Sequence, residues 1–210
     1  MKNLIVLGRG ESLSEIKKFN PKDFDACFIV NNFENEIKIS ESLGKFLKES
    51  KNVFQIVGRD HSSLMNEKIY KEFKIKKVIL NVLKEEYNNS PLVSSLKNMN
   101  VDSQHLPPTI LKFSENPHSS NGRAPFPTTG ICCLGFILAS YNCKSINTLG
   151  IDFYKSNYFY KSIVSNKKEP TDAQIKKGDR MIRHVKKMIK ENHKVEFKIN
   201  SSYNFINNKR

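Results

Sequence analysis

The chain has 210 residues, of which 38% are hydrophobic and 27% are charged. This composition supports one globular core and excludes a mainly disordered or collagen-like chain. The 35 Lys and Arg residues exceed the 21 Asp and Glu residues, and the formal net charge of +14 favours contact with nucleic acid, anionic lipid headgroups or phosphorylated substrates. The longest apolar run, 131–139, has about half the length that a membrane span needs.

The four cysteines have no CxxC spacing and lie in apolar runs, at Cys27, Cys132, Cys133 and Cys143. Free cysteine in such runs behaves as a small buried hydrophobe. We therefore expect a reduced, cytoplasmic protein.

An apolar run followed by a glycine-rich turn opens the chain. Residues 4–7 (Leu-Ile-Val-Leu) are typical of a strand that is buried on both faces of a parallel sheet. The turn at 8–13 reads Gly-Arg-Gly-Glu-Ser-Leu, and a helix-like stretch follows it. In such an arrangement, backbone N–H groups can approach a phosphate. Leu13 stands where a dinucleotide fingerprint has its third glycine, so the turn also fits an ordinary α/β protein.

The rest of the chain alternates between strand-like and helix-like segments. Further strands are expected at 25–30, 52–57, 76–80, 145–151 and 194–199, short extended pieces within 101–114, and helices at 37–47, 91–99, 131–141 and 171–192. Loop composition marks 114–127, and 155–170 is a polar, lid-like excursion. The pattern predicts a single α/β domain over 1–210, with a Rossmann-like, mainly parallel sheet and helices on both faces.

Two polar turns lie next to these elements. Asn31 and Asn32 end the second strand, where they could form Asx turns or contact a ligand. Thr128, Thr129 and Gly130 precede the apolar helix. Thr is a competent helix cap, and the N-terminus of such a helix offers N–H donors and a favourable dipole to an anion.

Four motifs, taken in order, resemble those of bacterial sialyltransferases of the lipooligosaccharide type. The turn at 8–13 is similar to the G-N-G-P-S-L turn of that family, and 31–33 (Asn-Asn-Phe) matches its N-Q-F. Residues 128–130 match a T-S-G turn before a hydrophobic helix. Residues 150–154 match a strand ending in G-I-D-F-Y, with a second tyrosine six residues later. The order and approximate spacing agree across most of the chain.

The resemblance implies a single-domain glycosyltransferase with a GT-A-like variant of the fold and a short lid. It implies inverting transfer of sialic acid, or a related sugar, from a CMP-sugar to a glycan or glycolipid acceptor, with no metal ion and no cofactor. The residues placed at the donor nucleotide are Gly8, Arg9, Gly10, Ser12, Asn31, Asn32, Thr128, Thr129, Gly130 and Asp152. Tyr154 and Tyr160 would donate hydrogen bonds to the departing phosphate, whose negative charge grows as the glycosidic bond breaks.

The sequence departs from the family pattern in two places. Arg9 and Glu11 replace the asparagine and proline of the first turn. Arg9 could pair with a phosphate or change which nucleotide fits. The family's catalytic base is a lid histidine, and 165–171 contains none. His118 and Glu169 are the candidate replacements for this base. Two other interpretations stay open: the substrate assists its own deprotonation, or the protein binds a nucleotide and has only weak transferase activity.

Partners and the alternative functions follow from charge and from the resemblance. The helix at 171–192 has a Lys- and Arg-rich face, which is either solvated or attached to anionic headgroups at the inner face of a bacterial membrane. The alternative enzyme is a pterin or nucleotide diphosphokinase of the sialyltransferase-like group, which would need ATP and Mg²⁺. Nucleic acid is not an expected partner, because the aromatic residues fall mostly within apolar strands. The sequence leaves open whether the protein forms a homo-oligomer.

Overall fold

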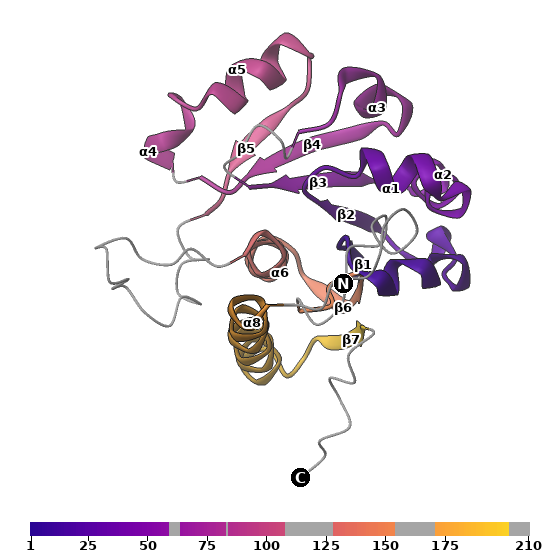
Figure 1. Cartoon of the computed structure of the whole chain (residues 1–210), viewed down its shortest axis with the longest axis vertical. Helices are drawn as coiled ribbons and strands as arrows, with labels where there is room; N and C mark the ends of the chain where they lie inside the picture. The colour runs from indigo at the N-terminus through magenta and orange to yellow at the C-terminus, as the bar shows by residue number, and fades with distance from the viewer. Residues whose placement is uncertain (59–63, 83, 108–127, 154–170, 202–210) are drawn as a thin grey trace.

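The fold is built on one parallel sheet. The computed structural model describes residues 1–58, 64–82, 84–107, 128–153 and 171–201. In these ranges seven strands form a single sheet in the order β5-β4-β3-β2-β1-β6-β7, and each pair of neighbours is parallel (Figure 1). The strands are β1 (Lys2–Leu7), β2 (Ala26–Val30), β3 (Val53–Val57), β4 (Ile75–Leu80), β5 (Ser103–His105), β6 (Cys143–Leu149) and β7 (Glu196–Asn200).

Helical segments precede the strands that follow β1. They are η1 (Glu11–Lys18), η2 (Pro21–Asp23), α1 (Glu34–Ile39), α2 (Glu41–Glu49), α3 (Glu67–Glu72), α4 (Lys84–Tyr87), α5 (Pro91–Asn98), α6 (Thr129–Ser140) and α8 (Asp172–Glu191). The chain runs outward from β1 to β5 and then returns to place β6 beside β1. In open α/β sheets, ligands bind where the strand order reverses in this way, at the edge where the parallel strands end. We call this edge the carboxyl edge.

Helices cover both faces of the sheet, as predicted. Along β1, Leu4 and Val6 belong to one apolar cluster, and Ile5 and Leu7 belong to the other, because successive side chains of a strand point to opposite faces. The first cluster is completed by α6 and α8, and the second by η1, α2, α3 and α5 (Figure 1). Each face of the sheet therefore has its own core.

The compositions of α6 and α8 match their positions. All side chains from Ile131 to Ile137 of α6 are buried, since this helix lies against the sheet and also contacts α8. On α8, Met181, Val185 and Met188 are buried; their spacing of four and three residues places them on one face of the helix. The Lys and Arg side chains of α8 described as exposed are Lys176, Arg180, Arg183, Lys186, Lys187 and Lys190.

The four cysteines are free thiols in buried positions, as expected for small apolar side chains. Burial raises the pKa of the Cys27 and Cys133 thiols well above the usual range. Both groups are therefore protonated at neutral pH, and neither is an activated nucleophile.

Three local predictions differ from the structure. The helix predicted over 37–47 is two helices, because α1 ends at Ile39 and the hydroxyl of Ser40 accepts a hydrogen bond from the Leu43 N–H (3.2 Å) at the start of α2. The stretch after the glycine turn is the 3-10 helix η1. The helix α4 was not predicted, since four residues are too few to show a helical period. The loop at 114–127 and the lid at 155–170 lie outside the described residues.

None of the helices in the described ranges combines the length and the apolar character that crossing a membrane requires.

Candidate functional site

The turn after β1 is pressed against the end of β6. The Gly8 N–H donates to the Leu149 carbonyl, and the Gly10 N–H donates to the Gly150 carbonyl, each at 2.7 Å. A Cβ on Gly8 would lie 2.3 Å from the Gly150 oxygen, and one on Gly150 (φ +73°) would lie 2.2 Å from the Gly8 oxygen. Glycine at both positions is therefore required by the close approach of two backbones.

Ser12 and Asp152 fasten this contact, and we call the pair the Ser12–Asp152 clamp. The Ser12 hydroxyl donates to Asp152 Oδ1 (2.5 Å), and the Ser12 N–H donates to Oδ2 (2.8 Å). Ser12 Oγ also accepts from the Gly150 N–H (2.8 Å) and lies 3.2 Å from the Asn200 carbonyl of β7. Both residues are buried, and charge-assisted hydrogen bonds offset the desolvation of the carboxylate.

The Ser12–Asp152 clamp also explains why position 10 must be a glycine. A Cβ on this residue would lie 2.4 Å from Asp152 Oδ2 and 2.9 Å from Asp152 Cβ. The backbone of Gly10 has an ordinary extended conformation (φ −77°, ψ 170°), so the requirement for glycine is steric. Gly10, Ser12 and Asp152, which sequence analysis places at the nucleotide, thus have a demonstrable structural role as well.

The second predicted turn begins α6. The Thr128 carbonyl accepts from the Cys132 N–H (2.9 Å), which makes Thr128 the N-cap residue. Its side chain forms no capping hydrogen bond, and its Oγ1 is buried without a partner. A capping threonine normally uses this oxygen to accept from a backbone N–H of the first turn. The Thr128 hydroxyl does not make this bond.

The two turns meet at the side chain of Ile151. A Cβ on Gly8 would lie 2.9 Å from Ile151 Cγ1, and a Cβ on Gly130 would lie 3.7 Å from Ile151 Cδ1. Ile151 is buried and directly follows the end of β6. The structure therefore brings the glycine turn and the start of α6 to the same part of the carboxyl edge, on either side of one side chain.

Asn31 and Asn32 follow the end of β2 at the carboxyl edge of the sheet. Asn31 adopts φ +65°, a left-handed conformation that asparagine tolerates better than most residues; its Oδ1 accepts from the Gly58 N–H (3.0 Å). Asn32 donates through Nδ2 to the Leu64 carbonyl (2.6 Å) and accepts through Oδ1 from the Glu34 N–H (2.8 Å). Both amides make the local turn contacts that sequence analysis considers for them, and their contact with nucleotide stays a prediction.

A buried polar chain supports Asn31 from behind. Gln55 of β3 donates through Nε2 to the Asn31 carbonyl (2.9 Å), and the Tyr70 hydroxyl donates to Gln55 Oε1 (2.7 Å). Burial raises the pKa of Tyr70 to about 12, so the phenol keeps its proton and remains the donor at neutral pH. These bonds hold the end of β2 in register with β3.

Arg9 lies on the other side of the glycine turn, towards α1. Its Nε donates to Glu36 Oε1 at 2.8 Å, and the Arg9 side chain is 22% exposed, whereas the Glu36 side chain is fully buried. Glu36 Oε2 has no hydrogen-bond partner. Sequence analysis did not single out Glu36. The sequence shows only an acidic residue shortly after the second strand, and nothing in it connects Glu36 with Arg9, 27 positions away.

Three predicted site residues cannot be placed. Tyr154, Tyr160 and His118 lie outside the described residues, so their distances from the two turns are not part of the geometry above. The same holds for Glu169.

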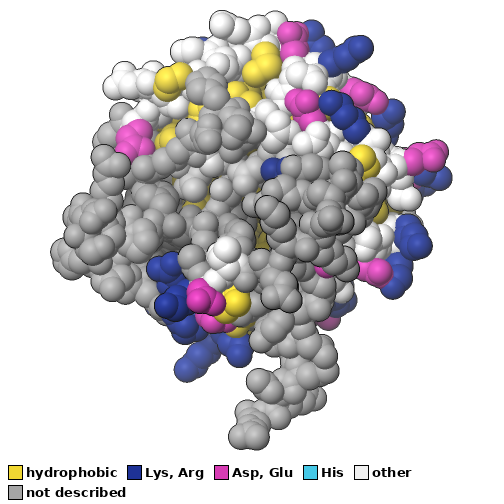
Figure 2. Space-filling view, viewed as in Figure 1, with side chains coloured by type: hydrophobic (Ala, Val, Ile, Leu, Met, Phe, Trp, Pro, Cys, Tyr) yellow, Lys and Arg dark blue, Asp and Glu magenta, His cyan; other side chains and the backbone are white. Residues whose placement is uncertain are grey.

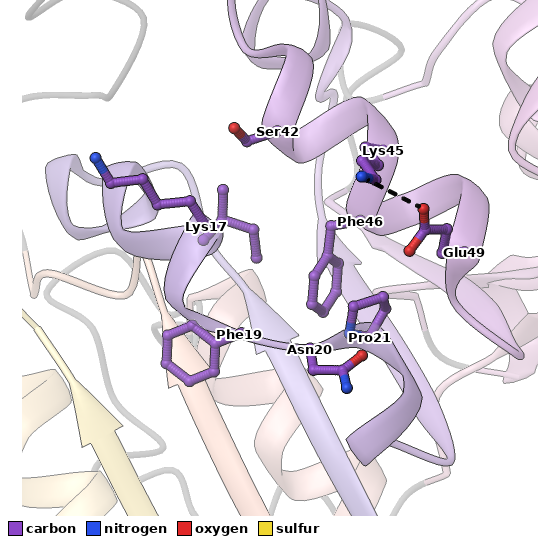
Figure 3. A pocket seen from close by; sticks show the side chains of 9 residues that line it. Lys17, Phe19, Asn20, Pro21, Ser42, Lys45, Phe46 and Glu49 are labelled. Atoms are coloured by element: carbon purple, nitrogen blue, oxygen red, sulfur yellow. Dashed lines mark ion pairs between the residues drawn. The ribbon is translucent and has the colours of Figure 1, made fainter.

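A groove of about 380 Å³ lies elsewhere, between the end of η1 and α2 (Figure 3). Figure 3 shows the side chains of Lys17 and Phe19 on the η1 side of the groove and those of Lys45 and Phe46 on α2. The residues that line it are Ile16, Lys17, Phe19, Asn20, Pro21, Ser42, Lys45, Phe46 and Glu49. No predicted site residue is among them, and the groove is not part of the carboxyl edge.

Comparison with known proteins identifies the fold. No family model matches the sequence, and no curated protein matches it significantly. Among solved structures, the sialyltransferase CstII from Campylobacter jejuni with a substrate analogue and cytidine-5′-monophosphate superposes with a TM-score of 0.59 at 21% identity, covering 96% of this chain and 80% of that one.

A second structure, of CST-II with a trisaccharide acceptor and CMP, gives a TM-score of 0.58 at 20% identity, covering 95% of this chain and 81% of that one. A third, of CstII from Campylobacter jejuni with CMP-3FNeuAc, gives 0.57 at 21% identity, with the same coverage of 95% and 81%. The chain thus has a sialyltransferase-like α/β fold, and at this level of identity the likeness establishes the fold.

The clamp predicts opposite effects for two glycine-to-alanine substitutions. Gly10→Ala pushes a methyl group into the Asp152 carboxylate and should lower the free energy of unfolding by about 1–3 kcal/mol. Gly44→Ala, in the middle of α2 with no atom within 4 Å of the new methyl group, should raise it by about 0.5–1 kcal/mol. Urea denaturation of both variants measures the difference. A Gly10→Ala variant as stable as wild type would contradict the contact.

Proposed function

We propose that the chain is a glycosyltransferase that moves sialic acid, or a related sugar, from a CMP-sugar to a glycan acceptor. The observation that carries the proposal is the meeting of the glycine turn and the start of α6 around Ile151. The fold supports it, because the similar structures hold CMP and, in one case, a trisaccharide acceptor. The donor nucleotide would lie over these two turns at the carboxyl edge.

The chemistry that such a site must perform is stabilisation of a leaving group. As the bond between the sugar and CMP breaks, negative charge grows on the phosphate. Donors fixed beforehand around the phosphate stabilise the transition state more than the bound donor sugar. The proposed donors are the backbone N–H groups at the start of α6 and the Thr128 hydroxyl. The helix dipole of α6 has the sign that favours the growing charge.

The transfer is proposed to be inverting and independent of a metal ion. The spacing Asp-x-Asp, which can bind a metal ion, occurs at Asp23 and Asp25. Asp25 directly precedes β2 and accepts a hydrogen bond from the Asn3 N–H, at the end of the sheet opposite to the glycine turn. These carboxylates are therefore not placed to hold a metal ion on the proposed phosphate. The base that deprotonates the acceptor is His118, Glu169 or the substrate itself.

A ligand panel tests the assignment. CMP should raise the melting temperature more than CDP, UDP, ATP with Mg²⁺ or a short oligonucleotide, because a ligand that binds the folded state alone stabilises it by mass action. A shift with ATP and Mg²⁺ alone would instead favour the diphosphokinase. A shift with the oligonucleotide that disappears in high salt would favour a nucleic-acid-binding module. No response to CMP at millimolar concentration would contradict the proposal.

Substitution of Tyr154 and Tyr160 tests their proposed hydrogen bonds to the departing phosphate. Tyr154→Phe and Tyr160→Phe should each lower kcat by about 10-fold or more and change KM for the CMP-sugar little, because a hydrogen bond to a developing charge is a transition-state interaction. Release of CMP in the presence of acceptor gives the rates. Tyr87→Phe is the matched control, since the Tyr87 hydroxyl bonds Ser103 near the β5 edge of the sheet. Unchanged turnover in the double variant would remove both tyrosines from the mechanism.

We also propose that α8 attaches the enzyme to anionic membrane surfaces, where glycolipid acceptors reside. Lys and Arg side chains gather over α8 in Figure 2, and its described basic residues are exposed. Each such residue near an anionic surface contributes about 1 kcal/mol. Lys187→Ala with Lys190→Ala should therefore weaken sedimentation with phosphatidylglycerol vesicles by about 30-fold. Lys45→Ala with Lys48→Ala on α2 is the control. Equal loss in both pairs would contradict a specific role for α8.

A further inference from the structure

Glu36 is a buried carboxylate with half of its hydrogen-bonding capacity unused. Its side chain is fully buried; Oε1 accepts from Arg9 Nε, and Oε2 has no partner. Asp152, the other buried carboxylate of this edge, accepts hydrogen bonds through both oxygens. A buried acceptor without a partner is costly. The imbalance at Glu36 therefore leaves a place for a donor from outside the chain, which is either a water molecule or a ligand.

The position of Glu36 limits what that donor can be. Arg9 lies within the glycine turn, two residues after the end of β1, and the bond of 2.8 Å to Glu36 brings the carboxylate to the side of the turn that faces β2. In dinucleotide-binding α/β sheets, an acidic residue about 20 positions after the glycine turn accepts a hydrogen bond from a ribose hydroxyl. Glu36 lies 27 positions after Arg9 of the glycine turn and six positions after the end of β2, which is a similar place in the chain.

The charges at the site also limit which donor can bind Glu36 Oε2. The guanidinium of Arg9 already balances the negative charge of Glu36. A second cation at Oε2 would leave a net charge in a buried position, which is unfavourable. A neutral hydroxyl supplies the missing hydrogen bond without adding charge.

We propose that Glu36 Oε2 accepts a hydrogen bond from a ribose hydroxyl of the bound nucleotide, and that Arg9 is the positioning residue that fixes the carboxylate by holding Oε1. The inference rests on the proposed function, since it takes a cytidine nucleotide as the ligand. It assigns to Glu36 the discrimination between ribonucleotides and deoxyribonucleotides.

Titration calorimetry with CMP, 2′-deoxy-CMP and 3′-deoxy-CMP tests this assignment on the full chain. Wild type should bind CMP about 10-fold or more tightly than at least one deoxy analogue, as expected for a lost hydrogen bond to a charged acceptor. In Glu36→Ala this ratio should fall to about two or less, because CMP loses affinity and that analogue does not. Glu41→Ala, at an exposed position in the first turn of α2, should keep the wild-type ratio.

Two further variants separate recognition from folding. Glu36→Gln keeps the volume and an oxygen for Arg9, and it should also reduce the ratio; it carries the test if Glu36→Ala does not fold. Arg9→Ala should weaken the binding of CMP and also lower the ratio. The double variant with Arg9→Ala and Glu36→Ala should have the same ratio as Arg9→Ala alone. A purely structural role would change the melting temperature of the variants and leave the ratio as it is.

The outcomes distinguish the two proposals. If wild type does not bind CMP, the proposed function fails. If wild type binds CMP and both deoxy analogues equally, or if the folded Glu36 variants keep the wild-type ratio, the inference about Glu36 fails and the proposed function stands.

Discussion

The hydrogen bonds between Ser12 and Asp152 are the interaction on which the carboxyl edge depends. They join the turn after β1 to the residues after β6, which are separated by 140 positions in the sequence, and the Gly150 N–H completes the arrangement. Because Gly8, Gly10 and Gly150 have no side chains, the two backbones approach closely enough for these bonds to form. Together with the Gly8–Leu149 and Gly10–Gly150 backbone hydrogen bonds, the clamp holds the glycine turn against Ile151 and thus beside the start of α6.

The same turn is held on its other side by a different kind of contact. Towards β6 every oxygen of the Asp152 carboxylate is bonded, whereas towards α1 the Arg9–Glu36 pair leaves Glu36 Oε2 without a partner. At the start of α6 the Thr128 hydroxyl is also buried without a partner. Thr148 Oγ1, within β6, is a further buried oxygen without a partner among the described residues, so an unmade hydrogen bond does not by itself mark a site. Glu36 Oε2 and Thr128 Oγ1 are the two such oxygens beside the clamped turn that the proposed nucleotide would satisfy.

The sequence predicted the framework because its signals are local. Apolar runs located most of the strands, alternation located the last one at 194–199, and the apolar circumference of 131–141 indicated a helix buried in a core. The helix break at Ser40 was not predicted, because Ser40 lies within an otherwise continuous helical spacing over 37–47. The partners of Ser12 and Arg9 could not be foreseen, since each contact joins residues that are 140 and 27 positions apart. Burial of Glu36 is a property of the packed fold and leaves no trace in a polar stretch of sequence.

Backbone amide chemical shifts on addition of CMP test most directly whether the clamped edge is the nucleotide site. The largest changes should fall on 8–12 and on 129–131 together, and 150–152 should also shift because the clamp connects these segments. Changes confined to the groove around Lys17 and Lys45, or to one of the two turns alone, would contradict a nucleotide site at this edge.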